Sequence, residues 1–134
     1  MKKLFKIISL MLVLVLIPMV SSCGSTFTYD KEAAVDHARQ LIESGNSGDY
    51  QAVSDRMHEA VRSQVPVESL RDTWEELLQS SGAFIGYEEA TTSVTVQNNA
   101  NYIVVVVPCK YENNTRTFTI TFTEDYKVVA LEMV

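Results

Sequence analysis

Two histidines are the side chains best suited to acid–base chemistry, and neither has an evident partner in the sequence. His37 follows Asp36 directly, and adjacent helical residues point about 100° apart, so Asp36 cannot orient the His37 ring. His58 lies in a polar run at the end of a predicted helix, where a partly cationic ring is favourable. We predict surface or boundary positions for both histidines and no enzymatic activity. An interior acid within hydrogen-bond reach of His37 would support catalysis instead.

The acidic residues show no metal-binding pattern. Adjacent pairs occur at residues 75–76, 88–89 and 124–125, and neighbouring side chains point apart on a helix and to opposite faces of a strand. None of the pairs has a histidine, cysteine or further acid at ligand spacing. We therefore predict solvated charge at these positions, with no metal and no cofactor.

Cys109 is a candidate nucleophile, but its surroundings predict an inert thiol. It follows Pro108 in an apolar stretch, has no histidine nearby in sequence, and alternates onto the same face as Val107 and Tyr111. A free cysteine in such a stretch behaves as a small buried hydrophobic side chain. Burial is therefore the favoured interpretation over nucleophilic catalysis.

The other cysteine, Cys23, ends a segment with the pattern of an export signal. The first six residues carry three lysines, residues 10–17 are apolar, and small residues precede the cysteine. Val20-Ser21-Ser22-Cys23 resembles the lipobox of bacterial lipoproteins, whose cysteine thiol accepts a diacylglyceryl group. We predict a signal peptide over residues 1–22, cleavage between Ser22 and Cys23, and lipidation of Cys23.

Two alternatives compete with this interpretation of the N-terminal segment. Ordinary secretory cleavage near Ser22 would make Cys23 incidental, and a retained transmembrane helix would need about 20 predominantly apolar residues. The apolar run is short and Pro18 interrupts it. Lipidation therefore predicts a protein anchored on the extracytoplasmic side of a cell membrane, in the cell envelope.

The net charge excludes nucleic acid as a partner. The chain has 11 basic and 17 acidic residues, a net charge of −6. Removal of residues 1–22 takes away three lysines and no acid, which leaves eight basic residues and a net charge of −9. A domain this acidic is repelled by nucleic acids and by anionic lipid headgroups.

Residues 23–29 read as the lipidated cysteine and a short tether, and residues 30–134 as one domain. Apolar residues recur at helical spacing in three segments of its first half. Asp30 can cap the first helix, Ser47 or Asp49 the second, and Pro66 suits the first turn of the third.

After Gly82 the apolar period changes from helical to alternating. Residues 83–97 read as one bent strand, followed by strands at 102–112, 115–123 and 127–133. Helices followed by consecutive hairpins predict an α+β fold, with three N-terminal helices packed on a curved antiparallel sheet of about four strands.

The strand from Tyr102 is apolar on both faces, since Tyr102, Val104 and Val106 alternate with residues that are equally apolar. Such a strand requires cover on both sides. A homodimer through the sheet would provide the cover, and so would a central position in a curled sheet. We favour the homodimer.

Several segments resemble the domain-of-unknown-function 3887 family, part of the nuclear-transport-factor-2-like superfamily. They are residues 48–53, Met57, residues 70–77 around Trp74, and Gly82-Ala83-Phe84. The resemblance implies a cone-shaped α+β domain, often carried by a bacterial lipoprotein. It implies little about chemistry, because the superfamily includes enzymes, ligand binders and dimerisation modules.

In such a cone, four residues would line a pocket for a small apolar ligand: Trp74, Tyr87, Cys109 and Tyr111. The alternative is a fully packed core. The predicted function is a membrane-anchored, non-enzymatic binding or assembly module, with an envelope protein or a small ligand as its partner. The alternative function is a carrier of a small apolar ligand.

Overall fold

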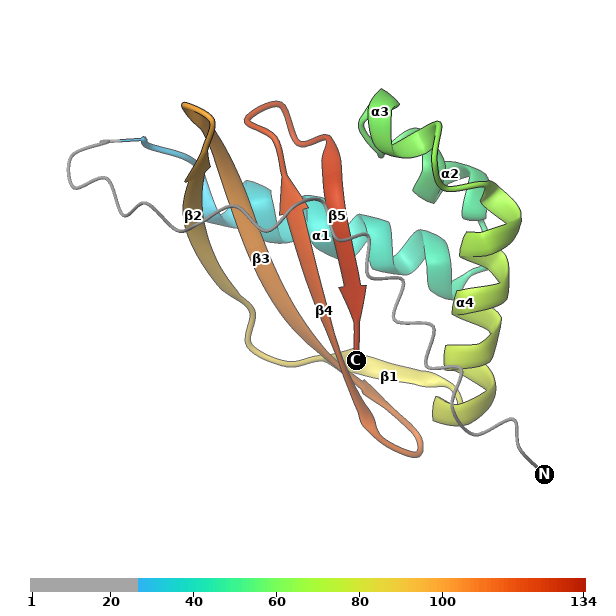
Figure 1. Cartoon of the computed structure of the whole chain (residues 1–134). Helices are drawn as coiled ribbons and strands as arrows, with labels where there is room; N and C mark the ends of the chain where they lie inside the picture. Colours follow the sequence, from blue (N-terminus) through green and yellow to red (C-terminus); the bar gives the residue numbers. More distant parts are fainter. Residues whose placement is uncertain (1–26) are drawn as a thin grey trace.

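The protein's computed structural model describes residues 27–134, in which helices precede an antiparallel sheet (Figure 1). The helices are α1 (Lys31–Asn46), α2 (Tyr50–Asp55), α3 (Glu59–Arg62) and α4 (Val67–Ser81). The strands are β1 (Phe84–Tyr87), β2 (Thr91–Gln97), β3 (Ala100–Tyr111), β4 (Thr115–Phe122) and β5 (Val128–Met133). The predicted signal peptide, Cys23 and the start of the tether lie outside the described residues.

Helices α1, α2 and α4 begin where their capping residues predict. The Asp30 carboxylate accepts a hydrogen bond from the Ala33 amide at 3.1 Å, and the Asp49 carboxylate accepts one from the Ala52 amide at 3.1 Å. Each bond satisfies an amide that the first helical turn leaves without a partner. The helix predicted from Pro66 is α4, whose N-cap is Pro66 itself. None of the helices within residues 27–134 is long and apolar enough to cross a membrane.

The predicted place of His58 is wrong, because α2 ends at Asp55 and a fourth helix, α3, follows. His58 caps α3, and its Nδ1 accepts a hydrogen bond from the Ala60 amide at 3.2 Å. The preceding residue, Met57, forms a β-bridge with Val128, and the His58 amide donates to the Val128 carbonyl at 2.8 Å. Pairing with the start of β5 therefore replaces the last turn predicted for the second helix.

The sheet has five strands, whereas the sequence predicted about four. The segment predicted as one bent strand is divided into β1 and β2 by residues 88–90, and both pair with β3 along the same edge. β3 can hold both because it is 12 residues long, and its other edge pairs with β4. β5 pairs with β4 and completes the antiparallel sheet.

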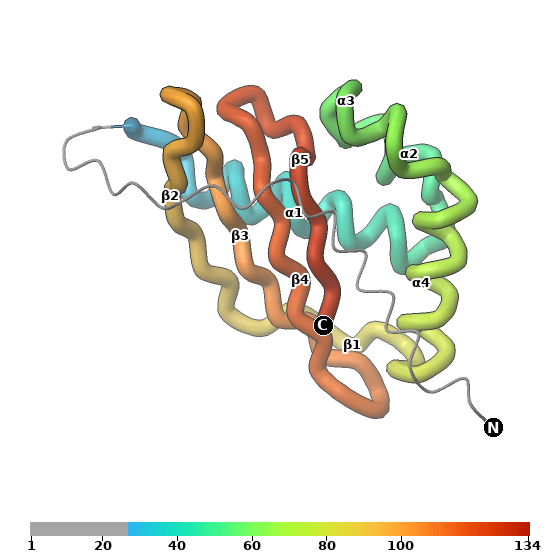
Figure 2. Tube along the Cα trace, in the orientation of Figure 1, coloured from blue at the N-terminus to red at the C-terminus, as the bar shows by residue number. Residues whose placement is uncertain are grey.

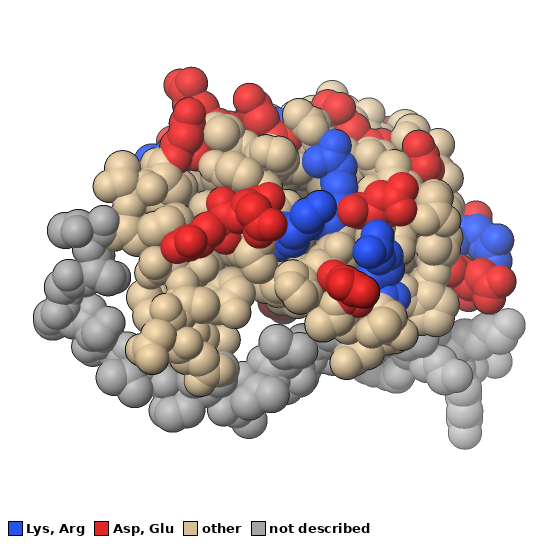
Figure 3. Space-filling model, turned by 90° about the horizontal axis from the view of Figure 1, so that it is seen from above, with Lys and Arg blue, Asp and Glu red and all other residues tan. Residues whose placement is uncertain are grey.

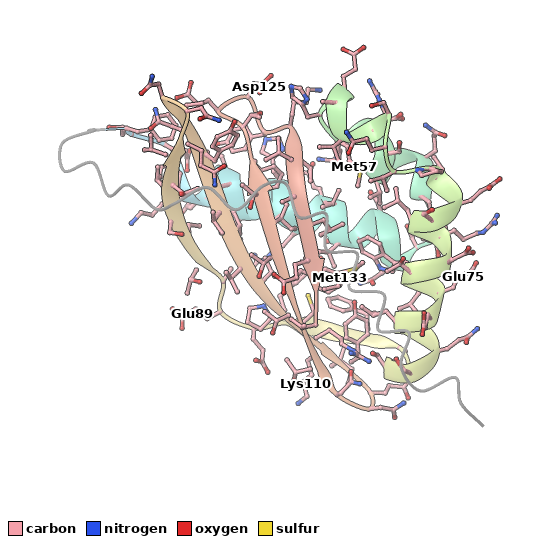
Figure 4. All side chains as sticks on the ribbon, in the orientation of Figure 1. Met57, Glu75, Glu89, Lys110, Asp125 and Met133 are labelled. Carbon is pink, nitrogen blue, oxygen red and sulfur yellow. The ribbon has the colours of Figure 1, made fainter. Side chains whose placement is uncertain are left out.

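The helices lie on one side of the sheet, with α1 running across the strands and α4 beyond β5 (Figures 1 and 2). The strand side chains that face the helices are almost completely buried, including Ile103, Val105 and Val107 of β3. Met57 and Met133 extend into the space between β5 and the helices (Figure 4). The core therefore lies between one face of the sheet and the helical layer.

Close contact between α1 and α4 depends on a glycine. A Cβ atom added to Gly45 would lie 2.0 Å from Cε2 of Trp74, so the indole ring occupies the space that any side chain would need. Trp74 is fully buried, and its ring also packs on Phe118 of β4 at a centroid distance of 5.6 Å. Gly45 thus allows the ring to fill the gap between α1, α4 and the sheet.

We predict that Gly45→Ala lowers the free energy of unfolding by about 2–3 kcal/mol, measured by urea denaturation. Overpacking against Trp74 outweighs the gain of about 1 kcal/mol that alanine brings to a helix interior. Gly48→Ala is the matched control: Gly48 has φ +82° and no atom within 4 Å of an added Cβ, so only backbone strain of about 1 kcal/mol is expected. Stabilisation by Gly45→Ala would contradict the packing described here.

Candidate functional site

The four residues predicted to line a pocket lie in one region of the interior. Trp74, Cys109 and Tyr111 are 0–1% exposed, and Tyr87 is half-buried. The Trp74 indole N–H donates to Asn46 Oδ1 at 3.1 Å, and the Tyr111 hydroxyl donates to the same atom at 2.8 Å. Asn46, Trp74 and Tyr111 thus form a hydrogen-bonded cluster that joins α1, α4 and β3.

Asn46 is a central residue that the sequence reasoning missed. It is the last residue of α1 and precedes the Gly48 turn, where an asparagine is common for local reasons alone. Its Oδ1 accepts both bonds of the cluster, while its Nδ2 is buried without a hydrogen-bond partner within residues 27–134. Only the placement of α1 against α4 and β3 reveals this role.

Burial raises the pKa values of the Cys109, Tyr111 and Tyr87 side chains. It raises the pKa of the Cys109 thiol to about 12, although the positive charge of Arg39 opposes the shift. Burial likewise raises the pKa of Tyr111 to about 12 against the effect of its bond to Asn46. The pKa of Tyr87 is raised by burial and by the nearby Glu43 carboxylate. The predicted burial of Cys109 is confirmed, and a thiol that stays protonated is a poor nucleophile.

His37 lies at the boundary of the core, where its ring stacks on Tyr126 at a centroid distance of 4.1 Å. Burial and the positive charge of Arg56 lower its pKa, and Asp36 opposes that effect. Within residues 27–134 no hydrogen bond or ion pair joins His37 to an acid. Its geometry is that of an aromatic contact between α1 and the β4–β5 turn.

The paired acids are spread over the surface. All six side chains are exposed, and Glu75, Glu89 and Asp125 point away from the core in Figure 4. The described part of the chain has no group of three histidine, cysteine or acidic residues that could hold a metal ion. Figure 3, which views the molecule from above, shows basic side chains interspersed with acidic ones on the face turned to the viewer, and no extended basic patch there.

A groove of about 400 Å³ runs between α1 and β2. The residues that line it are Lys31, Glu32, Val35, Asp36, Arg39, Ala90 and Thr92. The guanidinium carbon of Arg39 lies 4.9 Å from the centroid of the Tyr87 ring, which holds the side chain by a cation–π contact. Arg39 and this groove were not singled out by the sequence reasoning, because their relation depends on how β2 lies against α1.

The opposite face of the sheet has an uncharged centre. Its side chains alternate with the buried ones, so Tyr102, Val104 and Val106 of β3 all point away from the helices. Their neighbours on the same face are Thr91, Ser93 and Thr95 of β2, Thr117, Thr119 and Thr121 of β4, and Ala130 of β5. The charged residues of this face, Lys110 and Glu132, lie at its margins.

These features define an α+β domain with a buried apolar core, whose distinctive surfaces are a charged groove and an uncharged sheet face. The sequence profile described as "Protein of unknown function (DUF3887)" matches residues 38–131, and the chain belongs to this family. A comparison with curated proteins gives no match.

One solved structure is similar in fold and sequence, the NMR structure of a protein from Ruminococcus gnavus ATCC 29149. The TM-score is 0.71 and the sequence identity is 27%. The similarity covers 78% of this chain and 91% of the other.

We predict that Asn46→Ala lowers the free energy of unfolding by about 2–4 kcal/mol, because it leaves the Trp74 and Tyr111 donors buried without an acceptor. Tyr111→Phe removes one of the two bonds and should cost about 1 kcal/mol. Urea denaturation measures both changes. Gln79→Ala, at an exposed position of α4, is the control and should change stability by no more than about 0.5 kcal/mol. An equally small effect of Asn46→Ala would show that the cluster does not hold the helices and the sheet together.

Proposed function

We propose that the chain is a lipid-anchored protein of the bacterial cell envelope whose domain is a non-enzymatic assembly module. The anchor rests on the charged head, apolar run and Val20-Ser21-Ser22-Cys23 sequence of its first 23 residues. Two acyl chains on one cysteine hold a protein stably at a membrane, since each buried methylene contributes about 0.8 kcal/mol. The domain then works on the extracytoplasmic side, close to the membrane surface.

The domain fits the cone-like arrangement of the nuclear-transport-factor-2-like superfamily. A long helix, α1, runs across the concave side of an antiparallel sheet, and short helices close one end (Figures 1 and 2). Membership of the DUF3887 family is consistent with this assignment. The arrangement leaves the other side of the sheet without a covering helix among the described residues.

The observation that carries the proposed assembly role is the uncharged sheet face centred on Val104. A mature domain with a net charge of −9 repels a second copy of itself over most approaches. If two copies meet through this face, valine, tyrosine and threonine side chains lie opposite one another at its centre, and no like charges oppose each other there. We therefore assign a second copy of the chain as the occupant, in a two-fold dimer in which the same patch serves both partners.

The alternative function, a carrier of a small apolar ligand in the cone, has less support. Three of the residues predicted to line its pocket are 0–1% exposed. The Phe84 ring packs against Tyr87 and Tyr111, at centroid distances of 4.9 and 5.5 Å. Hydrogen bonds through Asn46 fix Trp74 and Tyr111 in the positions where a ligand would have to enter. Opening this region would break buried hydrogen bonds, which is costly.

The anchor is tested in the host by replacing Cys23 with serine. Metabolic labelling with an alkyne fatty acid should label the wild-type chain in the membrane fraction, and Cys23→Ser should abolish the label. Cys109→Ser is the matched control and should keep it, because that thiol is buried. Labelling of Cys23→Ser would contradict lipidation at this residue.

The dimer is tested by placing a charge at the centre of the sheet face. We predict that Val104→Lys converts a dimer into a monomer, measured by light scattering of the detergent-solubilised protein. Lysine lowers the net negative charge, so repulsion between whole domains cannot explain the loss. Gln79→Lys adds the same charge at an exposed position of α4 and should remain dimeric. A monomeric wild-type protein, or a dimeric Val104→Lys variant with a native melting temperature, would contradict the proposal.

A further inference from the structure

The groove between α1 and β2 contains an arginine that is held in place but lacks the polar partners expected for it. Asp36 precedes Arg39 by three residues and Glu43 follows it by four, positions from which helical side chains normally pair. Nevertheless, within residues 27–134 the ion pair found at 4.0 Å or less joins Arg71 and Asp72. Arg39 Nε is buried without a hydrogen-bond partner among the same residues.

An arginine in this state is suited to a planar anion. The Tyr87 ring fixes the guanidinium at 4.9 Å, so little conformational freedom is lost when a ligand binds. A guanidinium group pairs with a carboxylate through two parallel hydrogen bonds. Among the described residues, no carboxylate pairs with Arg39 in this way. The Arg39 side chain therefore points to a carboxylate as one end of the groove's ligand.

The opposite wall of the groove offers a hydroxyl group. Thr92 Oγ1 accepts a hydrogen bond from the Tyr29 hydroxyl at 2.9 Å. Its own O–H can therefore donate to a ligand, since a hydroxyl group both donates and accepts. Thr92 lies on the helix-facing side of β2, opposite Val105, and so shares the groove with Arg39.

The charged side chains that line the groove disfavour a ligand that carries only negative charge. Lys31 and Arg39 are balanced by Glu32 and Asp36, so the formal charge of the lining is zero. In an acidic domain such a groove repels an anion less than the rest of the surface does, and its acids attract a cationic group. A ligand with one positive and one negative group, spaced to reach Asp36 and Arg39, can pair with both an acidic and a basic side chain of the groove.

We propose that the α1–β2 groove binds a small zwitterion of the size of a dipeptide, with its carboxylate on Arg39 and its ammonium group on Asp36. Side chains three residues apart on a helix have Cβ atoms about 5–6 Å apart. An extended dipeptide spans about 7 Å, a length of the same order as that separation. The groove volume of about 400 Å³ lies in the range of small-molecule sites.

The test is isothermal titration calorimetry of the whole lipidated protein in detergent with L-alanyl-L-alanine. Saturable binding is expected. N-acetylation of the dipeptide removes its ammonium group and amidation removes its carboxylate, and either change should weaken binding at least about tenfold. Arg39→Gln should weaken binding of the unmodified dipeptide by a similar factor, whereas Arg71→Gln, at an exposed residue of α4, should leave it unchanged.

Asp36→Asn keeps the test decisive if Arg39→Gln disturbs the fold, because Asp36 is exposed. It should weaken binding of the dipeptide about tenfold without affecting the N-acetyl form. Absence of saturable binding up to millimolar concentrations would overturn the proposal, and so would equal affinities of the Arg39→Gln and Arg71→Gln variants. These results would leave the dimer unaffected, because Val104 lies on the other face of the sheet.

Discussion

The contact of Trp74 with Gly45 and Asn46 of α1 connects the helical layer of this domain to the sheet. Its indole ring occupies the space that a side chain at Gly45 would take, and its N–H donates to Asn46. Asn46 in turn accepts from Tyr111 of β3. A helix, a second helix and the sheet therefore meet at one buried contact, and changes at any of these positions alter the relation between the layers.

This contact also determines which parts of the molecule are available for function. The Trp74 and Tyr111 side chains, which could have lined a cavity, are instead buried and donate hydrogen bonds to Asn46, and burial raises the pKa of the Cys109 thiol to about 12. The features without a structural explanation lie outside this region. They are the uncharged sheet face around Val104 and the groove that contains Arg39. The proposed assembly and binding roles use these two surfaces, which lie on opposite sides of the sheet.

Helices α1, α2 and α4 and most strands could be predicted from the sequence because their signals are local. Asp30 and Asp49 cap helices with their own side chains, and the alternation of Phe118, Ile120 and Phe122 reports a strand with one buried face. The α+β class follows from the order of these elements.

What could not be predicted depends on residues distant in sequence. The division of residues 83–97 into β1 and β2 follows from their pairing with one long strand, and the position of His58 follows from pairing of Met57 with Val128. Asn46 and Arg39 have ordinary sequence surroundings. Asn46 acquires its role through Trp74 and Tyr111, which are 28 and 65 residues away, and Arg39 through the Tyr87 ring.

Native mass spectrometry of the protein, extracted from host membranes in a mild detergent, tests the central claim most directly. The account predicts a complex of two chains, each beginning at Cys23 and carrying the additional mass of the lipid on that residue. A single chain without lipid would contradict both the proposed anchor and the proposed dimer. A lipidated single chain would contradict the assembly role that we assign to the sheet face.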